Sequence, residues 1–317
     1  MQITKAVITA AGRGGRQYPT SDTVQKAMLP LVDRDGRTKP TLQIIAEEAL
    51  ASGIEELCVV TAPGDEERYR RHFQSYATGL LSDDPADGDG AEQSRIMAEL
   101  GRRLRFAVQP EPEGYGHAVW CARDFIGDEP FLLLLGDHVY VSHEDRSCAR
   151  QLLDLAAAEG CSVSAVQATR EHRINQFGTL SGRRLSERHD VYQIDEIIEK
   201  PTLTQAELKL HVPGLRVGHY LCFFGMHVLT PATIDLLGDL VGRGRREGVQ
   251  IQLTTALNEL ASRERYLALE TRGSRYNLGV KYGTVEAQIA LSLAGVDREP
   301  FLAGLLESVI RIDQAAT

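Results

Sequence analysis

The chain has 317 residues, of which 43% are hydrophobic and 25% charged, and its formal net charge is −9 at pH 7. This length allows one large α/β domain with a small appendage, or two domains, and the composition is that of a globular protein in water. The acidic balance argues against a nucleic-acid partner, and no apolar run approaches the roughly 18 residues that span a membrane. Because the first residues also lack a basic segment followed by an apolar one, we expect a cytoplasmic protein.

The 5 cysteines are widely spaced and lie mostly within apolar runs. They form no C-x-x-C pair, and the 9 histidines show no H-E-x-x-H spacing. The sequence therefore predicts buried free thiols, and neither a disulfide framework nor a zinc site.

The first stretch of the chain predicts a phosphate-binding loop. An apolar run over residues 6–11 is typical of a buried strand, and a glycine-rich turn, GRGGR at 12–16, follows it. Such a turn exposes backbone N–H groups that hold phosphate oxygens, and Arg16 and Lys26 add positive charge. This excess of basic residues within an acidic chain favours a polyanionic small molecule, and we interpret the loop as a site for a nucleoside triphosphate.

The hydrophobic pattern then alternates between helices and strands, as in a parallel sheet. Residues 79–93 are rich in Asp, Gly and Pro and predict a surface loop without the spacing of an EF-hand calcium loop. The predicted helices cover 40–52, 65–77 and a stretch ending at Arg123, and the predicted strands cover 56–62, 105–108 and 131–135.

The run at 131–135 (FLLLL) is the most apolar of these strands, so we expect it at the centre of the sheet. Asp137 follows it almost directly. A carboxylate in this position lies at the carboxyl edge of a parallel sheet, where ligands of α/β proteins bind. Asp137 is therefore a candidate metal ligand, with a turn or helix-capping residue as the alternative.

After a helix at 146–159 and a strand at 161–168, the pattern predicts antiparallel structure. Strands at 177–180 and 192–199 are expected to pair around a polar turn at 182–184. The remaining predictions are a long strand at 217–228, helices at 231–240 and 252–263, a strand at 266–270, a turn at 276–279, and amphipathic helices at 282–296 and 299–312.

Short motifs stand in a fixed order along residues 3–296. They are Gly12-x-Gly14-x-Arg16, Lys26-x-Met28-Leu29-Pro30, Gln109, Gly114-x-Gly116-His117-Ala118, Gly136-Asp137, Phe177-Gly178, Glu199-Lys200-Pro201, Gly218-x-Tyr220 and Ile251-Gln252-Leu253-Thr254. In this order and spacing the chain resembles the sugar-1-phosphate nucleotidyltransferases, and among them the bacterial UTP–glucose-1-phosphate uridylyltransferases, or UDP-glucose pyrophosphorylases. A lone glycine-rich loop would be weak evidence, whereas an ordered set is strong.

The resemblance implies a Rossmann-like three-layer α/β/α nucleotidyltransferase fold, with a mixed central sheet, a small antiparallel sugar-binding β region and C-terminal helices. Residues 1–281 would form the catalytic domain, with 1–145 binding mainly the nucleotide and 160–281 mainly the sugar phosphate. Residues 282–317 would form a helical segment that serves oligomerisation in a dimer or tetramer. The alternative is that these helices close the core of the monomer.

The resemblance also implies the reaction: a uridylyl group passes from UTP to a sugar 1-phosphate, best matched by glucose 1-phosphate, with Mg²⁺ as cofactor. A phosphate oxygen of the sugar attacks the α-phosphorus in line, and pyrophosphate leaves. Because two polyanions must meet and the attacking phosphate is already ionised, such a site works by positioning and charge.

The implied catalytic residues are Arg16 on the departing pyrophosphate, Lys26 on the α-phosphate and Lys200 on the sugar phosphate. Gln109 and the backbone of Gly114 would read the uracil edge. We assign no catalytic role to His117 or His138. The implied nucleotide-binding residues are Ala11, Gly12, Gly14, Gly15, Gln109 and Gly114, the sugar-binding residues are Gly178, Glu199 and Lys200, and the metal ligands are Asp137 and Asn277.

Several positions depart from the family pattern. The family usually has an aspartate where this chain has Asn277, whose amide oxygen can still bind a cation but carries no charge. The other departures are Asp22 for a basic residue, Ala27 for a glutamate, and Val249-Gln250 and Thr255 for acidic residues.

These departures leave two alternatives open. One is a diverged paralogue that uses another sugar 1-phosphate or nucleotide, and the other is a weakly active or non-catalytic regulator that binds nucleotide sugars. The retention of Arg16, Lys26, Asp137 and Lys200 favours an active enzyme. A Rossmann dehydrogenase is rejected because the first turn is GRGGR instead of G-x-G-x-x-G.

Overall fold

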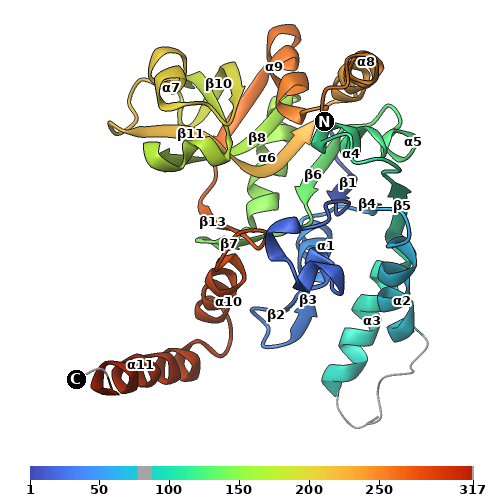
Figure 1. Cartoon of the computed structure of the whole chain (residues 1–317), viewed down its shortest axis with the longest axis vertical. Helices are drawn as coiled ribbons and strands as arrows, with labels where there is room; N and C mark the ends of the chain where they lie inside the picture. Colours follow the sequence, from blue (N-terminus) through green and yellow to red (C-terminus); the bar gives the residue numbers. More distant parts are fainter. Residues whose placement is uncertain (78–87, 316–317) are drawn as a thin grey trace. The chain divides into compact units, whose positions relative to one another are not determined.

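The structure, a computed structural model, describes residues 1–77 and 88–315 (Figure 1). The chain forms two compact units. The first unit comprises Met1–Gly12, Ala46–Leu135 and Arg146–Arg272, and the second comprises Arg13–Ile45, Gly136–Asp145 and Gly273–Thr317. Most of the predicted loop at 79–93 lies outside the described residues, and its end, from Gly88, belongs to a helix.

A nine-stranded mixed sheet organises the first unit, in the order β5-β4-β1-β6-β11-β8-β12-β10-β9. Its strands are β1 (Lys5–Thr9), β4 (Glu56–Thr61), β5 (Leu104–Val108), β6 (Phe131–Leu135), β8 (Ser162–Arg170), β9 (Gly178–Leu185), β10 (Arg188–Glu199), β11 (His219–Leu229) and β12 (Tyr266–Glu270). The first four are parallel, and β11 runs antiparallel to both β6 and β8. The predicted central strand is confirmed, because β6 lies between β1 and β11.

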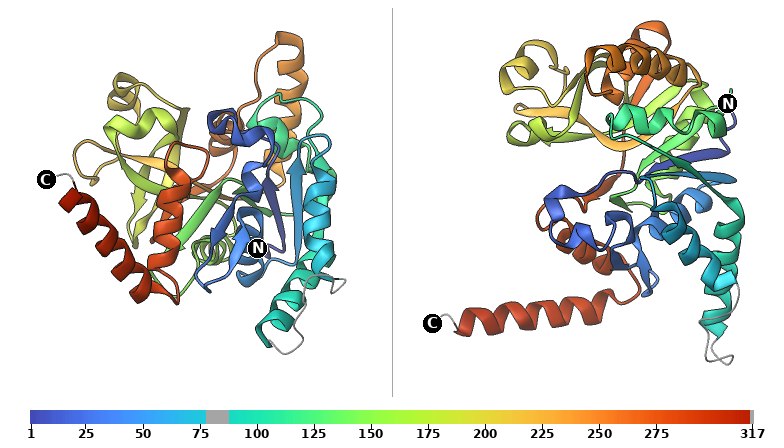
Figure 2. Two further views of the ribbon diagram at one scale, coloured as in Figure 1. Left: turned by 60° about the horizontal axis from the view of Figure 1, so that its bottom comes forward. Right: turned by 45° about the vertical axis from the view of Figure 1, so that its right-hand side comes forward.

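Helices cover this sheet. They are α2 (Glu66–Ala77), α3 (Gly88–Arg103), α4 (Tyr115–Trp120), α5 (Arg123–Ile126), α6 (Cys148–Glu159), α7 (Leu203–Lys209), α8 (Ala232–Glu247) and α9 (Leu253–Arg263), while α1 (Thr41–Ala51) carries the chain from the second unit into the first. Helices α8 and α9 pack side by side, and α6 packs on β8 and β11 (Figures 1 and 2). Within the described ranges, no helix is both long and apolar enough to cross a membrane.

One hydrophobic cluster joins the sheet to α4, α8 and α9. Phe131 and Leu133 of β6 are fully buried in it, together with Leu237 of α8 and Leu257 of α9. Burial of one such side chain stabilises the fold by about 1.5–3 kcal/mol. Because alternate residues of a strand face opposite sides, this cluster and the buried Leu132 and Leu134 cover both faces of β6.

The second unit contains small antiparallel sheets, short 3-10 helices at Gly15–Gln17, Thr20–Asp22 and Lys26–Met28, and the C-terminal helices. The strand β2 (Pro30–Val32) pairs with β3 (Thr38–Pro40), and β7 (His138–Ser142) pairs with β13 (Gly273–Asn277). The helices α10 (Gly283–Leu293) and α11 (Arg298–Ala315) follow, and Figure 2 shows α11 running away from α10. A small core of Leu31, Val139, Val141, Leu278 and Leu291 holds the sheets and α10 together.

Two predicted turns are wrong. Residues 182–184 lie inside β9, and the connection to β10 falls at 186–187. A Cβ at position 182 would lie 2.4 Å from the carbonyl oxygen of Gln193. Glycine therefore permits the close pairing of β9 with β10 at this point. In the predicted turn at 276–279, Tyr276 and Asn277 continue β13, because they pair with β7, and the turn begins at Leu278.

Candidate functional site

The glycine-rich loop enters the second unit at Arg13, and Gly14 is its most constrained residue. Gly14 has a φ of 67°, and a Cβ there would lie 2.8 Å from Cγ of Lys26. Glycine is therefore required both by the left-handed backbone and by the lysine stem that crosses it. Gln17 ties the loop to the turn after β13, because its amide donates to the carbonyl of Leu278.

Other predicted loop residues are more open. Gly12, Gly15 and Arg16 are exposed, and no hydrogen bond or ion pair of the Arg16 side chain occurs among the described residues. Ala11, in the first unit, packs partly against the main hydrophobic cluster. The loop thus presents an uncommitted guanidinium together with exposed backbone, as expected of a site for a phosphate group.

Asp137, directly after β6, is the centre of a polar cluster in the second unit. Its Oδ2 atom lies 2.8 Å from Nζ of Lys26, and its Oδ1 atom lies 2.8 Å from Nδ1 of His138. Asn277 ends β13 opposite His138. A Cβ on Gly279 would lie 3.0 Å from both Oδ1 of Asn277 and Oδ2 of Asp137, so these side chains converge on the same point.

At neutral pH the carboxyl group of Asp137 in this cluster is ionised. Burial opposes ionisation of Asp137, but hydrogen bonds and charge from His138 and Lys26 outweigh it and hold the pKa of Asp137 well below its usual range. Burial also lowers the pKa of His138, although Asp137 acts in the opposite direction. At neutral pH we therefore assign Lys26 and Asp137 as the charged pair and His138 as a neutral donor through Nδ1.

The donor set of the cluster suits a hard divalent cation. Asp137 offers a carboxylate and Asn277 an amide oxygen, and oxygen donors are what Mg²⁺ and similar ions prefer. The Asn277 oxygen also accepts the backbone N–H of Gly279 at 2.8 Å, which fixes its direction. Within the described residues, no group of three or more His, Cys, Asp or Glu could hold a metal. A cation held by Asp137 and Asn277 therefore needs further ligands, which substrate phosphates can supply.

Gln109 and Gly114, both predicted to read a base, lie together in the first unit. The Nε2 atom of Gln109 donates to the carbonyl of Gly114 at 3.0 Å. Gly114 has a φ of 118°, and a Cβ there would lie 2.5 Å from the carbonyl oxygen of Ile251. Ile251 fastens this loop, because its N–H donates to Glu113 and its carbonyl accepts from Gly116.

The predicted sugar-binding residues also meet in the first unit. Gly178 begins β9 opposite Glu199 at the end of β10. A Cβ on Gly178 would lie 2.8 Å from both Phe223 and Thr254, so these side chains fill the space and only glycine fits here. Lys200 has a φ of 47° directly before a proline, a combination that is strained for a residue with a side chain. Its Nζ atom lies 3.4 Å from Oε1 of Glu199.

Sequence reasoning assigned no role to Phe223, Thr254 and Gln17. Thr254 ends one of the sequence motifs, so a signal existed, but its contact with Gly178 depends on the fold. Phe223 and Gln17 stand in ordinary patterns, and nothing in the sequence distinguishes them from core or loop residues.

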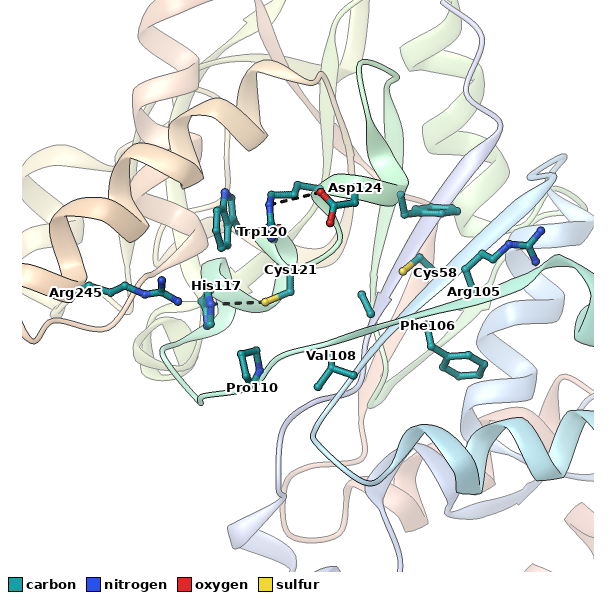
Figure 3. Close-up of a pocket in the computed structure, with 13 residues that line it drawn as sticks. Cys58, Arg105, Phe106, Val108, Pro110, His117, Trp120, Cys121, Asp124 and Arg245 are labelled. Carbon is teal, nitrogen blue, oxygen red and sulfur yellow. Dashed lines mark hydrogen bonds and ion pairs between the residues drawn. The ribbon is translucent and has the colours of Figure 1, made fainter.

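A pocket of about 530 Å³ in the first unit lies apart from the predicted residues (Figure 3). Its lining includes Cys58, Arg105, Val108 and Trp120, and none of the predicted site residues, all of them described, lines it. His117 and Arg245 stand at one end of the pocket, next to Pro110. The pocket therefore comes close to the loop of Gln109 and Gly114 through His117 without including either residue.

The sheet order, the glycine-rich loop and the polar cluster around Asp137 are typical of a nucleotide-binding α/β protein of the nucleotidyltransferase class. Residues 5–268 match the family model described as "Nucleotidyl transferase". The chain belongs to this family, and both the predicted family and the predicted fold are confirmed.

Relatives cover almost the whole chain. UTP–glucose-1-phosphate uridylyltransferase YngB of Bacillus subtilis is 33% identical over 311 residues, which cover 98% of this chain and 96% of the relative. Another UTP–glucose-1-phosphate uridylyltransferase of B. subtilis is 34% identical over 319 residues, covering 96% and 98%. Among solved structures, a UDP-glucose pyrophosphorylase complexed with UDP-glucose matches with a TM-score of 0.72 at 27% identity, covering 91% of this chain and 98% of that one.

The UTP-bound enzyme from Acinetobacter baumannii has a TM-score of 0.72 at 23% identity, covering 96% of this chain and 99% of that one, which supports the fold. The protein is an enzyme, a nucleotidyltransferase. Members of this family generally use a divalent metal ion.

Replacing Asp137 by Asn tests the ion pair with Lys26 through the pH dependence of stability. The pKa of Asp137 is lower in the folded protein than in the unfolded chain, where it is about 3.9. The unfolded chain therefore binds more protons as the pH falls, and the stability that Asp137 contributes at neutral pH is lost below about pH 4. Between about pH 5 and pH 3, we expect the urea midpoint of the wild type to fall more steeply than that of Asp137→Asn.

Asp195→Asn is the matched control. Asp195 pairs with Arg183 at 3.1 Å on the surface, where such pairs contribute little, so this variant should keep the wild-type slope. Parallel slopes for the wild type and Asp137→Asn would contradict the assignment.

Proposed function

We propose that the protein transfers a uridylyl group from UTP to glucose 1-phosphate, giving UDP-glucose and pyrophosphate. The observation that carries this proposal is the similarity to UTP–glucose-1-phosphate uridylyltransferases over nearly the full length of both chains. The clustering of Lys26 with Asp137, of Gln109 with Gly114, and of Gly178 with Glu199 supports it.

On the nucleotide side, the loop from Ala11 to Arg16 holds the triphosphate, with Arg16 on the oxygens of departing pyrophosphate. Lys26 steadies the α-phosphate; its Nζ atom, now paired with Asp137, can exchange part of that contact for a phosphate oxygen. Gln109 and the backbone of Gly114 read the uracil edge. Residues 1–145 thus serve mainly nucleotide binding.

On the sugar side, Gly178 and Glu199 contact hydroxyl groups and Lys200 contacts the phosphate. Gly178 lies close to the Glu199 carboxylate, since a Cβ there would lie 3.3 Å from Oε2 of Glu199. The strained backbone of Lys200 supports a functional reason for its orientation. Residues 160–281 thus serve mainly sugar-phosphate binding.

Asp137 and Asn277 are the residues that would hold Mg²⁺. When bound, the ion offsets the negative charge of the reacting phosphates. The chain's own groups orient the phosphates and balance their charge, and no general base is needed, because the attacking phosphate is already ionised.

We further propose that the enzyme is a cytoplasmic homo-oligomer, dimer or tetramer, that associates through residues 282–317. All five cysteines are free thiols, as suits a reducing compartment. Leu306, Val309 and Ile310 of α11 are each more than half exposed, a pattern typical of a helix that meets a partner.

Turnover is the direct test of the proposed function. We expect pyrophosphate release when UTP, glucose 1-phosphate and Mg²⁺ are supplied together, and none when any one of them is omitted. If no nucleotide and sugar 1-phosphate of a test panel is turned over in either direction, the proposed reaction is refuted. Binding of UDP-glucose without turnover would instead support a regulator.

Lys200→Ala tests the side of the site to which Lys200 is assigned. Loss of a charged hydrogen bond to the sugar phosphate should raise KM for glucose 1-phosphate, or lower kcat/KM, by about 10- to 100-fold. The KM for UTP should change much less. Lys209→Ala, which removes an exposed lysine of α7 paired with Glu196, is the control and should leave both constants unchanged. An equal loss for both substrates would refute the assignment.

Asn277→Asp tests the metal assignment. A carboxylate next to Asp137 adds the charge that a hard cation prefers, so half-maximal activity should require less Mg²⁺. A Mg²⁺-dependent rise in melting temperature should begin at a lower concentration as well. Ser274→Asp adds the same charge elsewhere on β13 and should change neither titration. Unchanged titrations for Asn277→Asp would exclude Asn277 from the metal site.

A further inference from the structure

The pocket of about 530 Å³ in the first unit lies apart from the residues assigned to the substrates. Figure 3 shows His117 and Arg245 at one end of it and Arg105 at the other, with Cys121 and Cys58 between them. Small-molecule sites have volumes of roughly 300–1,000 Å³, so a pocket of this size can hold one small ligand. Its lining decides which chemistry that ligand must have.

The middle of the pocket is lined by apolar and uncharged side chains. The register of β4 with β5 sets Cys58 opposite Arg105, so both side chains point to the same face of the sheet. On that face, the partly buried Trp120, Cys121 and Phe125 line the pocket and pack against the main hydrophobic cluster, which contains Cys58. Burial raises the pKa of the Cys58 thiol to about 12 and also raises the pKa of Cys121, so both thiols are neutral near pH 7. This part of the pocket therefore suits an aromatic or aliphatic group.

The charged side chains of the pocket are mostly basic. Of the described residues that line it, three are arginines and one is an aspartate, although the chain as a whole has a net charge of −9. Arg245 is already balanced, because it donates to both carboxylate oxygens of Glu113. Arg123 stacks on Trp120, with its Cζ atom 3.9 Å from the ring centroid, and its Nε atom lies 3.7 Å from Oδ1 of Asp124. These two arginines therefore have partners within the protein.

Arg105 is the cation that is left for a ligand. Its Nη1 atom donates to the carbonyls of Arg102 at 2.9 Å and Leu104 at 3.2 Å, and within the described residues its guanidinium meets no carboxylate. A guanidinium has further N–H donors in a planar fork, which matches the two oxygens of a carboxylate. A single guanidinium balances a single negative charge, so a carboxylate is the anionic group that this end of the pocket fits.

We propose that the pocket is a binding site for a small aromatic or aliphatic carboxylate, with the carboxylate at Arg105 and the apolar body against Trp120, Cys121 and Phe125. The inference does not depend on the proposed function, because the pocket lies apart from the residues assigned to UTP and glucose 1-phosphate. A neutral molecule of the same shape lacks the ionic contact with Arg105 and should bind more weakly.

The test uses tryptophan fluorescence, because Trp120 is the single tryptophan of the chain and lines the pocket. The probes are 4-phenylbutyrate and its neutral amide, 4-phenylbutyramide, which share one body. We expect 4-phenylbutyrate to change the emission of Trp120 in a saturable way, and calorimetry to give the same Kd. The amide should bind about 3- to 10-fold more weakly, since the contact with an exposed arginine is of moderate strength.

Substitutions locate the two halves of the ligand. Arg105→Gln should weaken 4-phenylbutyrate to the level of the amide and leave the amide unchanged, whereas Arg105→Lys should keep most of the preference. Ala107→Phe, on the same face of β5, fills the pocket and should abolish binding of both probes; its melting curve checks that the variant folds. Arg183→Gln removes an exposed arginine of β9 that pairs with Asp195 outside the pocket, and as the control it should bind both probes like the wild type.

Lack of saturable binding, or equal affinity of the wild type for carboxylate and amide, would overturn the proposal. Binding detected by calorimetry without a change in Trp120 emission would place the anion elsewhere and overturn it as well. An unchanged preference in Arg105→Gln would remove Arg105 from the site. Saturating UTP should not displace 4-phenylbutyrate; competitive displacement would assign the pocket to the nucleotide and refute a separate site. None of these measurements requires turnover, so failure of the proposed reaction would leave them decisive.

Discussion

An acidic protein of the nucleotidyltransferase family must hold its basic side chains in fixed positions, and the ion pair of Lys26 with Asp137 does this. The stem of Lys26 crosses Gly14, and its ammonium reaches the carboxylate that follows β6. The pair is only partly buried, so its desolvation cost is moderate, and hydrogen bonding from His138 offsets part of it. The lysine is thus preorganised next to the phosphate loop and still accessible to an anion.

In the first unit, a corresponding constraint is the close packing of residues 251–254 against three glycines. The carbonyl of Ile251 touches the positions where Gly114 and Gly116 lack side chains, and Thr254 does the same at Gly178. One short segment before and within the first turn of α9 therefore supports both the loop of Gly114 and Gly116 and the start of β9. Its motif residues act through packing and backbone hydrogen bonds, which explains why the stretch accompanies the ligand-binding motifs without carrying a charged group.

Much of the fold could be predicted because its strands are short apolar runs and its helices have clear periodicity. The errors arose where tertiary contacts set the structure. The glycine at 182 looks like a turn residue, but it lies in a strand because the pairing with β10 needs close backbone contact. The strand β7 was not predicted, because its five residues follow Asp137 directly and only pairing with β13 makes them a strand.

For the predicted site, too, the sequence identified residues but not the contacts that depend on the fold. Residue types and motif order were enough to single out Lys26, Asp137 and Asn277, and the structure brings these three together. The hydrogen bond from Gln109 to the carbonyl of Gly114 could not be predicted, because it depends on the path of the backbone between these two residues. Motifs reveal which groups are present, but the donors and acceptors around them decide what each group offers to a ligand.

The choice of Asn at position 277 changes the net charge of the cluster around Asp137. With Asn277, the cluster has one carboxylate and one ammonium, so Lys26 and Asp137 balance each other. With the aspartate that the family usually has, two carboxylates would face one lysine, and the excess negative charge would attract a cation before any substrate arrived. On the proposed assignment of Asp137 and Asn277 to the metal, most of the negative charge that attracts the ion comes from the phosphates of the substrates. Metal and nucleotide should therefore bind more interdependently here than in a relative with two carboxylates.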